Sequence, residues 1–259
     1  MNELKFTLIQ ANLIWENVDE NLANFEKKIN AISNPTHVVV LPEMFNTGFS
    51  MNATQLAENM DGKTMMWMKK MAKEKKIILC GSLMIKESDF FYNRMIWMQP
   101  DGKYFFYDKR HLFSLAGEEK VFTKGENRVI VQVGGWRILL QVCYDLRFPV
   151  WSRQQNNNEY DVVLYVANWP DKRILAWNTL LQARAIENLS YSIGVNRVGH
   201  DEKGNNYIGN SKVFSPLGEQ LIKNSESDEV LQVVLEKDKL NEIRSQFNFL
   251  SDKDDFLIQ

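Results

Sequence analysis

Three side chains that could perform chemistry together, an acid, a cation and a thiol, each follow an apolar run with strand character. They are Glu43, Lys109 and Cys143, which come after the runs 38–41, 104–108 and 138–142. Open α/β sheets bind ligands at the carboxyl ends of their strands, so the three side chains could meet at one site. A nucleophile, a base and an anion stabiliser are the groups that acyl transfer needs. Alone, Glu43 or Lys109 would be interpreted as a solvated surface charge. Their combination with Cys143 favours catalysis.

The elements that must position these residues alternate between strands and helices. In the first half, strands are predicted at 4–10, 38–41, 77–85, 91–98 and 104–109, with helices at 22–32 and 65–72. After a turn near Gly134-Gly135, strands are predicted at 137–142, 162–166, 191–196, 211–215 and 230–235, with helices after Pro149 and at 176–187. The second half echoes the first. This pattern predicts an α/β fold, a four-layer α-β-β-α sandwich of two packed mixed sheets.

The length and composition indicate one domain over residues 1–259. The chain is 44% hydrophobic, which is enough for a large core, and single α/β domains commonly reach about 250 residues. From about residue 239 the sequence becomes polar with scattered apolar residues. We expect this C-terminal segment to dock on the body or on a partner subunit.

The charge pattern excludes several classes of partner. The formal net charge is −2 and the lysines are interspersed with acids, so neither nucleic acid nor a membrane surface is expected, and the ligand is a small molecule. The chain has two cysteines, too few for a disulfide framework, and we recognise no secretory signal in it. No apolar run approaches the roughly 18 residues of a membrane span, so the cytoplasm is the expected compartment. The three histidines, His37, His111 and His200, are scattered and have no cluster of cysteines or acids at ligand spacing, so no metal is predicted.

Three sequence blocks resemble the signature blocks of the nitrilase superfamily of carbon-nitrogen hydrolases. They are LPEMF at 41–45, YDKRHL at 107–112 and CYDLRFP at 143–149. The resemblance implies the predicted sandwich and hydrolysis of an amide through a cysteinyl thioester. Cys143 would be the nucleophile and Glu43 its base, and Lys109 and the backbone N–H of Tyr144 would stabilise the oxyanion. It also implies a homodimer and no cofactor.

A second glutamate is implied by the same resemblance. Many family members carry one in the loop after the lysine block, seven positions before a glycine. Glu118 has this spacing to Gly125, but its neighbour Glu119 leaves the register open. A solvated acidic pair is the alternative interpretation.

Segments further along the chain resemble the omega-amidase branch of the superfamily. They are NWP at 168–170, AW at 176–177, QARAIEN at 182–188 and GVNRVG at 194–199. This branch acts on 2-oxoglutaramate and 2-oxosuccinamate, so Asn168 and Trp169 are expected at the substrate site. The remote carboxylate of such a substrate needs a cation. Arg173, Arg147 and Lys172 are the candidates, although Arg173 could be a surface residue and Arg147 a structural ion-pair residue.

Three other functions stay open at this point. Within the same chemistry, the chain could hydrolyse other small amides or N-carbamoyl amines. A catalytically silent scaffold is disfavoured because a binding module has no need of Glu43, Lys109 and Cys143 together. A redox thiol protein is disfavoured because Cys80 lies within an apolar run and is a poor resolving partner.

Overall fold

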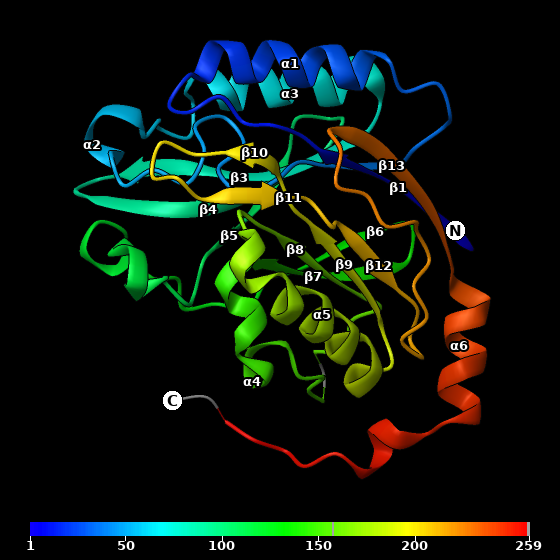
Figure 1. Ribbon diagram of the computed structural model, residues 1–259. Coiled ribbons are helices and arrows are strands. Elements are labelled where there is room, and N and C mark those ends of the chain that lie inside the picture. The colour runs from blue at the N-terminus through cyan, green and yellow to red at the C-terminus, as the bar shows by residue number, and fades with distance from the viewer. Residues whose placement is uncertain (157, 258–259) are drawn as a thin grey trace.

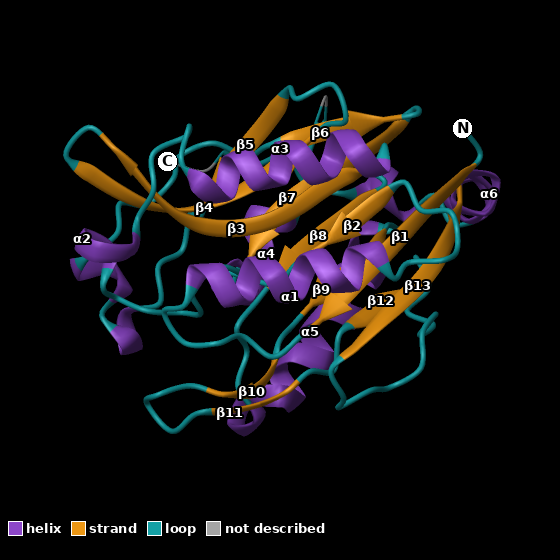
Figure 2. Ribbon diagram, turned by 90° about the horizontal axis from the view of Figure 1, so that it is seen from above, coloured by secondary structure: helices purple, strands orange, loops and turns teal. Residues whose placement is uncertain are grey.

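The computed structural model describes residues 1–156 and 158–257, which form four layers (Figure 1). Two sheets pack face to face in the middle. Helices α1 and α3 cover the outer face of the first sheet, and α5 covers the outer face of the second (Figures 1 and 2). The predicted fold class, a four-layer α-β-β-α sandwich of two mixed sheets, is confirmed.

The first sheet has six strands in the order β13-β1-β2-β3-β4-β5. Strands β1, β2 and β3 are parallel, and the remaining pairs are antiparallel. The strands are β1 (Glu3–Gln10), β2 (Val38–Val40), β3 (Ile78–Glu87), β4 (Phe90–Met98), β5 (Tyr104–Asp108) and β13 (Glu229–Glu236).

The second sheet has five strands in the order β12-β9-β8-β7-β6, of which β7, β8 and β9 are parallel. The strands are β6 (Ile130–Val133), β7 (Trp136–Val142), β8 (Val162–Val166), β9 (Tyr191–Val195) and β12 (Lys212–Phe214). Gly134 and Gly135 join β6 to β7 with φ of 54° and 85°, a left-handed turn that suits glycine in a hairpin. A separate hairpin consists of β10 (Val198–His200) and β11 (Asn206–Ile208).

The helices follow the predicted order, with short additions. They are α1 (Val18–Asn30), α2 (Ala53–Leu56), α3 (Lys63–Lys75), α4 (Pro149–Ser152), α5 (Ile174–Asn188) and α6 (Lys237–Gln246). The described residues contain no helix that is both long and apolar enough to cross a membrane.

The central strands are apolar on both faces because each sheet lies between two layers. In β2, Val38 and Val40 pack in the cluster between the sheets, whereas Val39 packs against the outer helices. In β8, Leu164 faces the other sheet and Val163 faces α5. Such strands read as continuous hydrophobic runs, and this is why their positions could be predicted from the sequence.

Two parts of the structure differ from the prediction that both halves of the sequence have the same order of strands and helices. Strand β13, near the C-terminus, pairs with β1 and so belongs to the first sheet. The hairpin β10–β11 belongs to neither sheet and had no counterpart in the prediction. An apolar run predicts a strand, but its pairing partner depends on contacts far away in the sequence.

The C-terminal segment lies against the second half of the same chain. In α6, Arg244 donates hydrogen bonds to the carbonyls of Leu189 (2.8 Å) and Tyr160 (2.7 Å). Further on, Asp255 accepts a hydrogen bond from Asn156 at 2.7 Å. Residues 258–259 of the predicted segment lie outside the described residues.

Candidate active site

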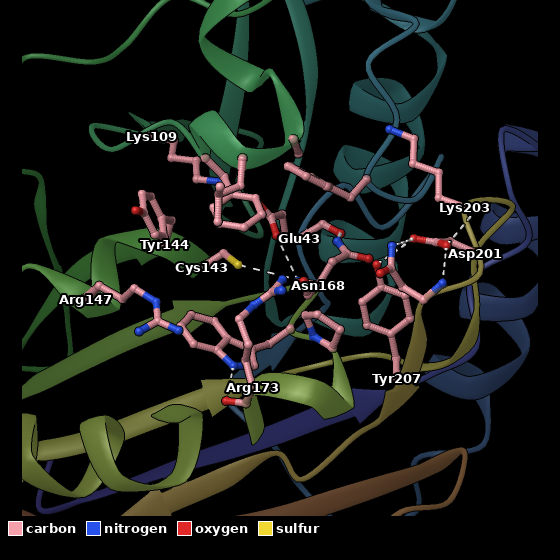
Figure 3. Close-up of a pocket in the computed structure, with 17 residues that line it drawn as sticks. Glu43, Lys109, Cys143, Tyr144, Arg147, Asn168, Arg173, Asp201, Lys203 and Tyr207 are labelled. Atoms are coloured by element: carbon pink, nitrogen blue, oxygen red, sulfur yellow. Dashed lines mark hydrogen bonds and ion pairs between the residues drawn. The ribbon is translucent and has the colours of Figure 1, made fainter. Parts of the chain in front are cut away.

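The three predicted catalytic side chains come from the ends of strands in both sheets. Glu43 follows β2 of the first sheet, and Lys109 directly follows β5 of the same sheet. Cys143 directly follows β7 of the second sheet and is the first residue of the 3₁₀ helix η3 (Cys143–Arg147). All three line one pocket (Figure 3).

Lys109 is held between two buried carboxylates. Its Nζ lies 2.9 Å from Oε1 of Glu43 and 2.9 and 3.0 Å from the two carboxylate oxygens of Glu118. None of the three side chains is exposed to solvent. Burial disfavours the ammonium, but Glu118 and Glu43 outweigh it and raise the pKa of Lys109 above its usual value. The lysine is therefore a fixed positive charge.

Glu118, and not Glu119, lies against Lys109 in the pocket region. Glu118 is fully buried, whereas Glu119 is exposed on the same 3₁₀ turn. Glu118 accepts hydrogen bonds from Lys109, from Nδ2 of Asn93 (3.1 Å) and from the backbone N–H of Phe113 (2.6 Å). Every partner is a donor, so the side chain is a carboxylate, although burial raises its pKa and Lys109 opposes that rise.

Asn93, on β4, ties the two carboxylates together and was missed in the sequence. Its Nδ2 also donates to Oε1 of Glu43 at 2.8 Å, and its Oδ1 accepts a hydrogen bond from Ser82 Oγ at 2.8 Å. Ser82 in turn accepts one from the backbone N–H of Met44, the residue after Glu43. The polar pair Asn93-Arg94 inside a mostly apolar strand was the signal that could have found Asn93.

Asn168 fixes Glu43 from the side of the second sheet. Its backbone N–H donates to Oε2 of Glu43 at 2.8 Å, and its Nδ2 donates to the Glu43 carbonyl at 2.6 Å. Its Oδ1 is buried without a hydrogen-bond partner among the described residues. The backbone carbonyl oxygen of Asn168 lies 4.0 Å from Sγ of Cys143, so Asn168 contacts both Glu43 and the thiol.

Cys143 is partly exposed to the pocket and has a left-handed backbone, with φ of 45°. A non-glycine residue in this region is uncommon and is held there by its surroundings. Burial and then the Glu43 carboxylate raise the pKa of the thiol, and Lys109 only partly opposes them. The resting sulfur is therefore protonated, and a base has to remove its proton when it attacks.

Tyr144 is the second residue of η3, and it lines the pocket beside Cys143. Backbone N–H groups in the first turn of a helix have no acceptor within that helix. The N–H of Tyr144 is thus suited to donate to an oxygen held near the sulfur. The phenol ring packs edge-on against Phe113 and Phe148, with centroid distances of 5.0 and 5.1 Å.

The pocket has a volume of about 390 Å³ and carries two of the three predicted cations. Arg147 stacks over the ring of Trp169 at 5.0 Å, and Arg173 lies over the ring of Phe113 at 5.1 Å. Trp169 also donates its indole N–H to the carbonyl of Arg173 at 2.8 Å. Within the described residues neither arginine forms an ion pair, whereas Lys172 is exposed and does not line the pocket.

The hairpin β10–β11 supplies a wall that the sequence did not reveal. Asp201, Lys203 and Tyr207 lie across the pocket from Arg147 (Figure 3). Asp201 accepts hydrogen bonds from Tyr207 Oη (2.8 Å) and from Asn205 Nδ2 (2.8 Å). Burial raises the pKa of Asp201, but these and two backbone hydrogen bonds outweigh it and lower the pKa. The wall is therefore a fixed, charged loop.

Over residues 1–156 and 158–257 no group of three or more histidine, cysteine or acidic side chains could hold a metal ion. The arrangement offers instead a thiol, a neighbouring carboxylate, a buried ammonium and a backbone N–H. These groups can carry out nucleophilic acyl transfer.

Comparisons with known proteins agree with this chemistry. The family model for carbon-nitrogen hydrolases matches residues 5–245. Omega-amidase YafV of Yersinia enterocolitica is 44% identical over 100% of both chains, and a 2-oxoglutaramate amidase of Bacillus subtilis is 28% identical over 96% of this chain and 98% of that protein. Among solved structures, XC1258 of Xanthomonas campestris, a CN-hydrolase superfamily protein with an arsenic adduct in its active site, has a TM-score of 0.97 and 37% identity with full coverage of both chains.

Proposed function

This chain belongs to the carbon-nitrogen hydrolase family of the nitrilase superfamily, and we propose that it is an omega-amidase. Its reaction is release of ammonia from the omega-amide of a 2-oxo dicarboxylic acid, such as 2-oxoglutaramate or 2-oxosuccinamate. The relatives named omega-amidase and 2-oxoglutaramate amidase support the reaction class. The observation that carries the proposal is the pocket, in which Cys143, Glu43 and Lys109 lie together with two arginines that form no ion pair with any described residue.

The first half of the reaction forms a thioester. Glu43 accepts the proton of the Cys143 thiol, and the sulfur attacks the amide carbon, forming a C–S bond and a tetrahedral oxyanion. The Lys109 ammonium and the N–H of Tyr144 stabilise that oxygen. Removing one donor of this kind typically slows a reaction about a hundred- to a thousandfold. Glu43 then returns the proton to the amide nitrogen, the C–N bond breaks and ammonia leaves.

The second half hydrolyses the thioester. Glu43, again a carboxylate, takes a proton from water as the water oxygen attacks the acyl carbon. The same donors stabilise the second tetrahedral oxyanion. The C–S bond then breaks, the acid product leaves and the sulfur regains its proton from Glu43. Glu118 acts through Lys109, since both of its oxygens hold that ammonium in place.

The substrate is recognised at both ends. Asn168 lines the pocket, and its Oδ1 has no hydrogen-bond partner in the described part of the chain, so it suits a substrate amide N–H. At the other end, Arg173 or Arg147 pairs with the carboxylate, which a guanidinium can bind through two hydrogen bonds. The Trp169 ring supports the Arg147 guanidinium, and its indole N–H holds the backbone carbonyl of Arg173.

A substrate panel tests the proposal. Ammonia release should be fastest with 2-oxoglutaramate or 2-oxosuccinamate and slower with neutral amides, N-carbamoyl amines and nitriles. If an N-carbamoyl amine is the best substrate and the 2-oxo acid amides are not turned over, the omega-amidase proposal is wrong, while the family chemistry stands.

We propose further that the whole chain acts as one catalytic domain in a cytoplasmic homodimer. Pairing of β1 with β13 joins the two ends of the chain in one sheet, which supports a single domain. Both cysteines are free, and a nucleophilic thiol benefits from a reducing compartment. On α5, Leu175 and Ile186 are 78% and 49% exposed, and a second copy could cover them. Light scattering of the purified protein measures the assembly.

A further inference from the structure

Asp145 is a fully buried carboxylate that the proposed reaction does not use. Its Oδ2 accepts hydrogen bonds from the backbone N–H of Val142 (2.9 Å) and from Tyr107 Oη (2.8 Å). Its Oδ1 accepts one from the backbone N–H of His111 (3.0 Å) and lies 2.8 Å from Nδ1 of the same histidine. One side chain therefore collects four contacts from three separate residues.

These partners flank the two groups that must meet during catalysis. Tyr107 and His111 lie two residues before and two residues after Lys109, and Val142 directly precedes Cys143. The Tyr107 hydroxyl is itself fixed, since it accepts hydrogen bonds from Trp151 Nε1 at 2.9 Å and from the backbone N–H of residue 110 at 3.2 Å. Asp145 thus joins the end of β5 to the end of β7.

That connection crosses from one sheet to the other. Strand β5 pairs with β4 in the first sheet, and β7 pairs with β6 and β8 in the second. Among the described strands, no ladder of backbone hydrogen bonds joins β5 to β7 and so sets the distance between Lys109 and Cys143. Side chains must set it, as Asn168 does for Glu43.

We propose that Asp145 is the positioning residue that holds the Cys143 thiol in register with the Lys109 ammonium across the two sheets. This inference rests on the proposed function, in which Lys109 stabilises the oxyanion formed by attack of Cys143. The left-handed backbone at Cys143 has to be held by its surroundings, and the bond from Val142 to Asp145 is adjacent to it. A misplacement of about 1 Å can slow catalysis about a hundredfold.

Asparagine cannot replace this carboxylate, although it has the same shape. Both oxygens of Asp145 face a backbone N–H, from Val142 on one side and from His111 on the other. An amide has one acceptor oxygen, so its NH₂ would face one of those donors whichever way it is turned. The variant Asp145→Asn therefore breaks one side of the connection while keeping the volume.

The test compares Asp145→Asn with the wild-type enzyme and with a matched control. For Asp145→Asn, kcat for ammonia release should fall about a hundredfold with KM within about threefold of wild type, because chemistry is misaligned and binding is not. The control is Asp161→Asn. Asp161 is also a buried carboxylate and accepts the backbone N–H of Arg137 at 2.8 Å, near the opposite end of β7. The control should lose stability but keep kcat.

Alkylation of Cys143 by iodoacetamide gives a second readout that needs no substrate. Cys80 is fully buried and does not compete. Loss of a nearby negative charge alone would favour the thiolate and make alkylation at pH 8 faster. If the Cys143 sulfur instead moves away from Lys109, its thiolate loses the stabilising positive charge. Alkylation should then be slower, by about tenfold for each unit by which the thiol pKa rises.

The outcomes separate the inference from the proposed function. Slower alkylation and lower kcat in Asp145→Asn, with neither change in Asp161→Asn, support it. Unchanged or faster alkylation, or an equal loss of kcat in the control, overturns it. If wild-type enzyme releases no ammonia from the 2-oxo acid amides, the proposed function fails, and alkylation still decides the role of Asp145. If Asp145→Asn does not fold, Tyr107→Phe is tested in its place, because it removes one of the four contacts. Alkylation of Cys143 in Tyr107→Phe should be slower than in wild type by less than about tenfold, and an unchanged rate overturns the inference.

Discussion

Replacing Glu118 by glutamine should disable catalysis more than it disturbs folding. The glutamine is nearly isosteric but neutral, and its NH₂ would face donors from Lys109, Asn93 or Phe113. Removing one partner of a buried ion pair costs about 3–5 kcal/mol when the remaining charge is uncompensated. Lys109 keeps Glu43 as a partner at 2.9 Å, so we expect a stability loss near the lower end of that range.

The catalytic effect follows from the movement of the ammonium. Without Glu118, Lys109 pairs with Glu43 alone, and the ammonium is no longer held where it stabilises the oxyanion. Loss of one oxyanion donor corresponds to about a hundredfold or more in kcat, roughly 2.7–4 kcal/mol. Coupled ammonia release measures kcat, and urea unfolding measures stability.

The neighbouring acid provides the control for this variant. Glu119 is exposed on the same turn, so Glu119→Gln should match wild type in both assays. Activity of Glu118→Gln within about threefold of wild type would refute the positioning role assigned to Glu118.

Three further results are expected. Cys143→Ala should abolish ammonia release and change unfolding free energy by less than about 1 kcal/mol, and residual turnover would contradict its role as nucleophile. Arg173→Met should lower kcat/KM for 2-oxoglutaramate about 10- to 100-fold, the cost of one charged hydrogen-bonded contact, yet leave a neutral amide nearly unaffected; an equal loss for both amides would exclude carboxylate recognition. Burial and Glu43 raise the folded-state pKa of the Cys143 thiol above its unfolded-state value of about 8.5. The protonated thiol therefore contributes its full share of the unfolding free energy below about pH 8.5. Above that pH its contribution declines by up to about 1.4 kcal/mol per pH unit. Urea unfolding at pH 8 and 9.5 should show a smaller loss for Cys143→Ala than for wild type, and equal losses would argue against the shift.

The meeting of Glu43, Lys109 and Cys143 in one pocket could be predicted because each of them follows an apolar run that marks a buried strand. Glu43, Lys109 and Cys143 each sit within a few residues of a strand end, so their signal is local. The second acid was different. Glu118 and Glu119 share one polar turn, and only the packing of that turn buries the first and exposes the second.

Gly125, the glycine seven positions after Glu118, is required at its position for a steric reason. A Cβ on Gly125 would lie 2.1 Å from the carbonyl oxygen of Asp108, the last residue of β5. The loop therefore passes directly over the strand end that precedes Lys109. No side chain fits there, and the sequence shows the glycine without showing what it approaches.

The far wall of the pocket could not be predicted from the sequence. Strands β10 and β11 have three residues each, too few for a periodic pattern, and Asp201 and Lys203 are separated from Cys143 by more than one strand and helix. The position of β13 in the first sheet could not be predicted from the local sequence either. Its apolar alternation predicted a strand, but its place beside β1 depends on contacts between the two ends of the chain.

Intact-mass analysis of enzyme quenched during turnover of 2-oxoglutaramate would detect the cysteinyl thioester itself. We expect an adduct equal in mass to the substrate less ammonia, located on the peptide that contains Cys143 and absent from Cys143→Ala. Ammonia release by wild-type enzyme with no adduct on Cys143 under any quench, or an adduct on another residue, would contradict that mechanism.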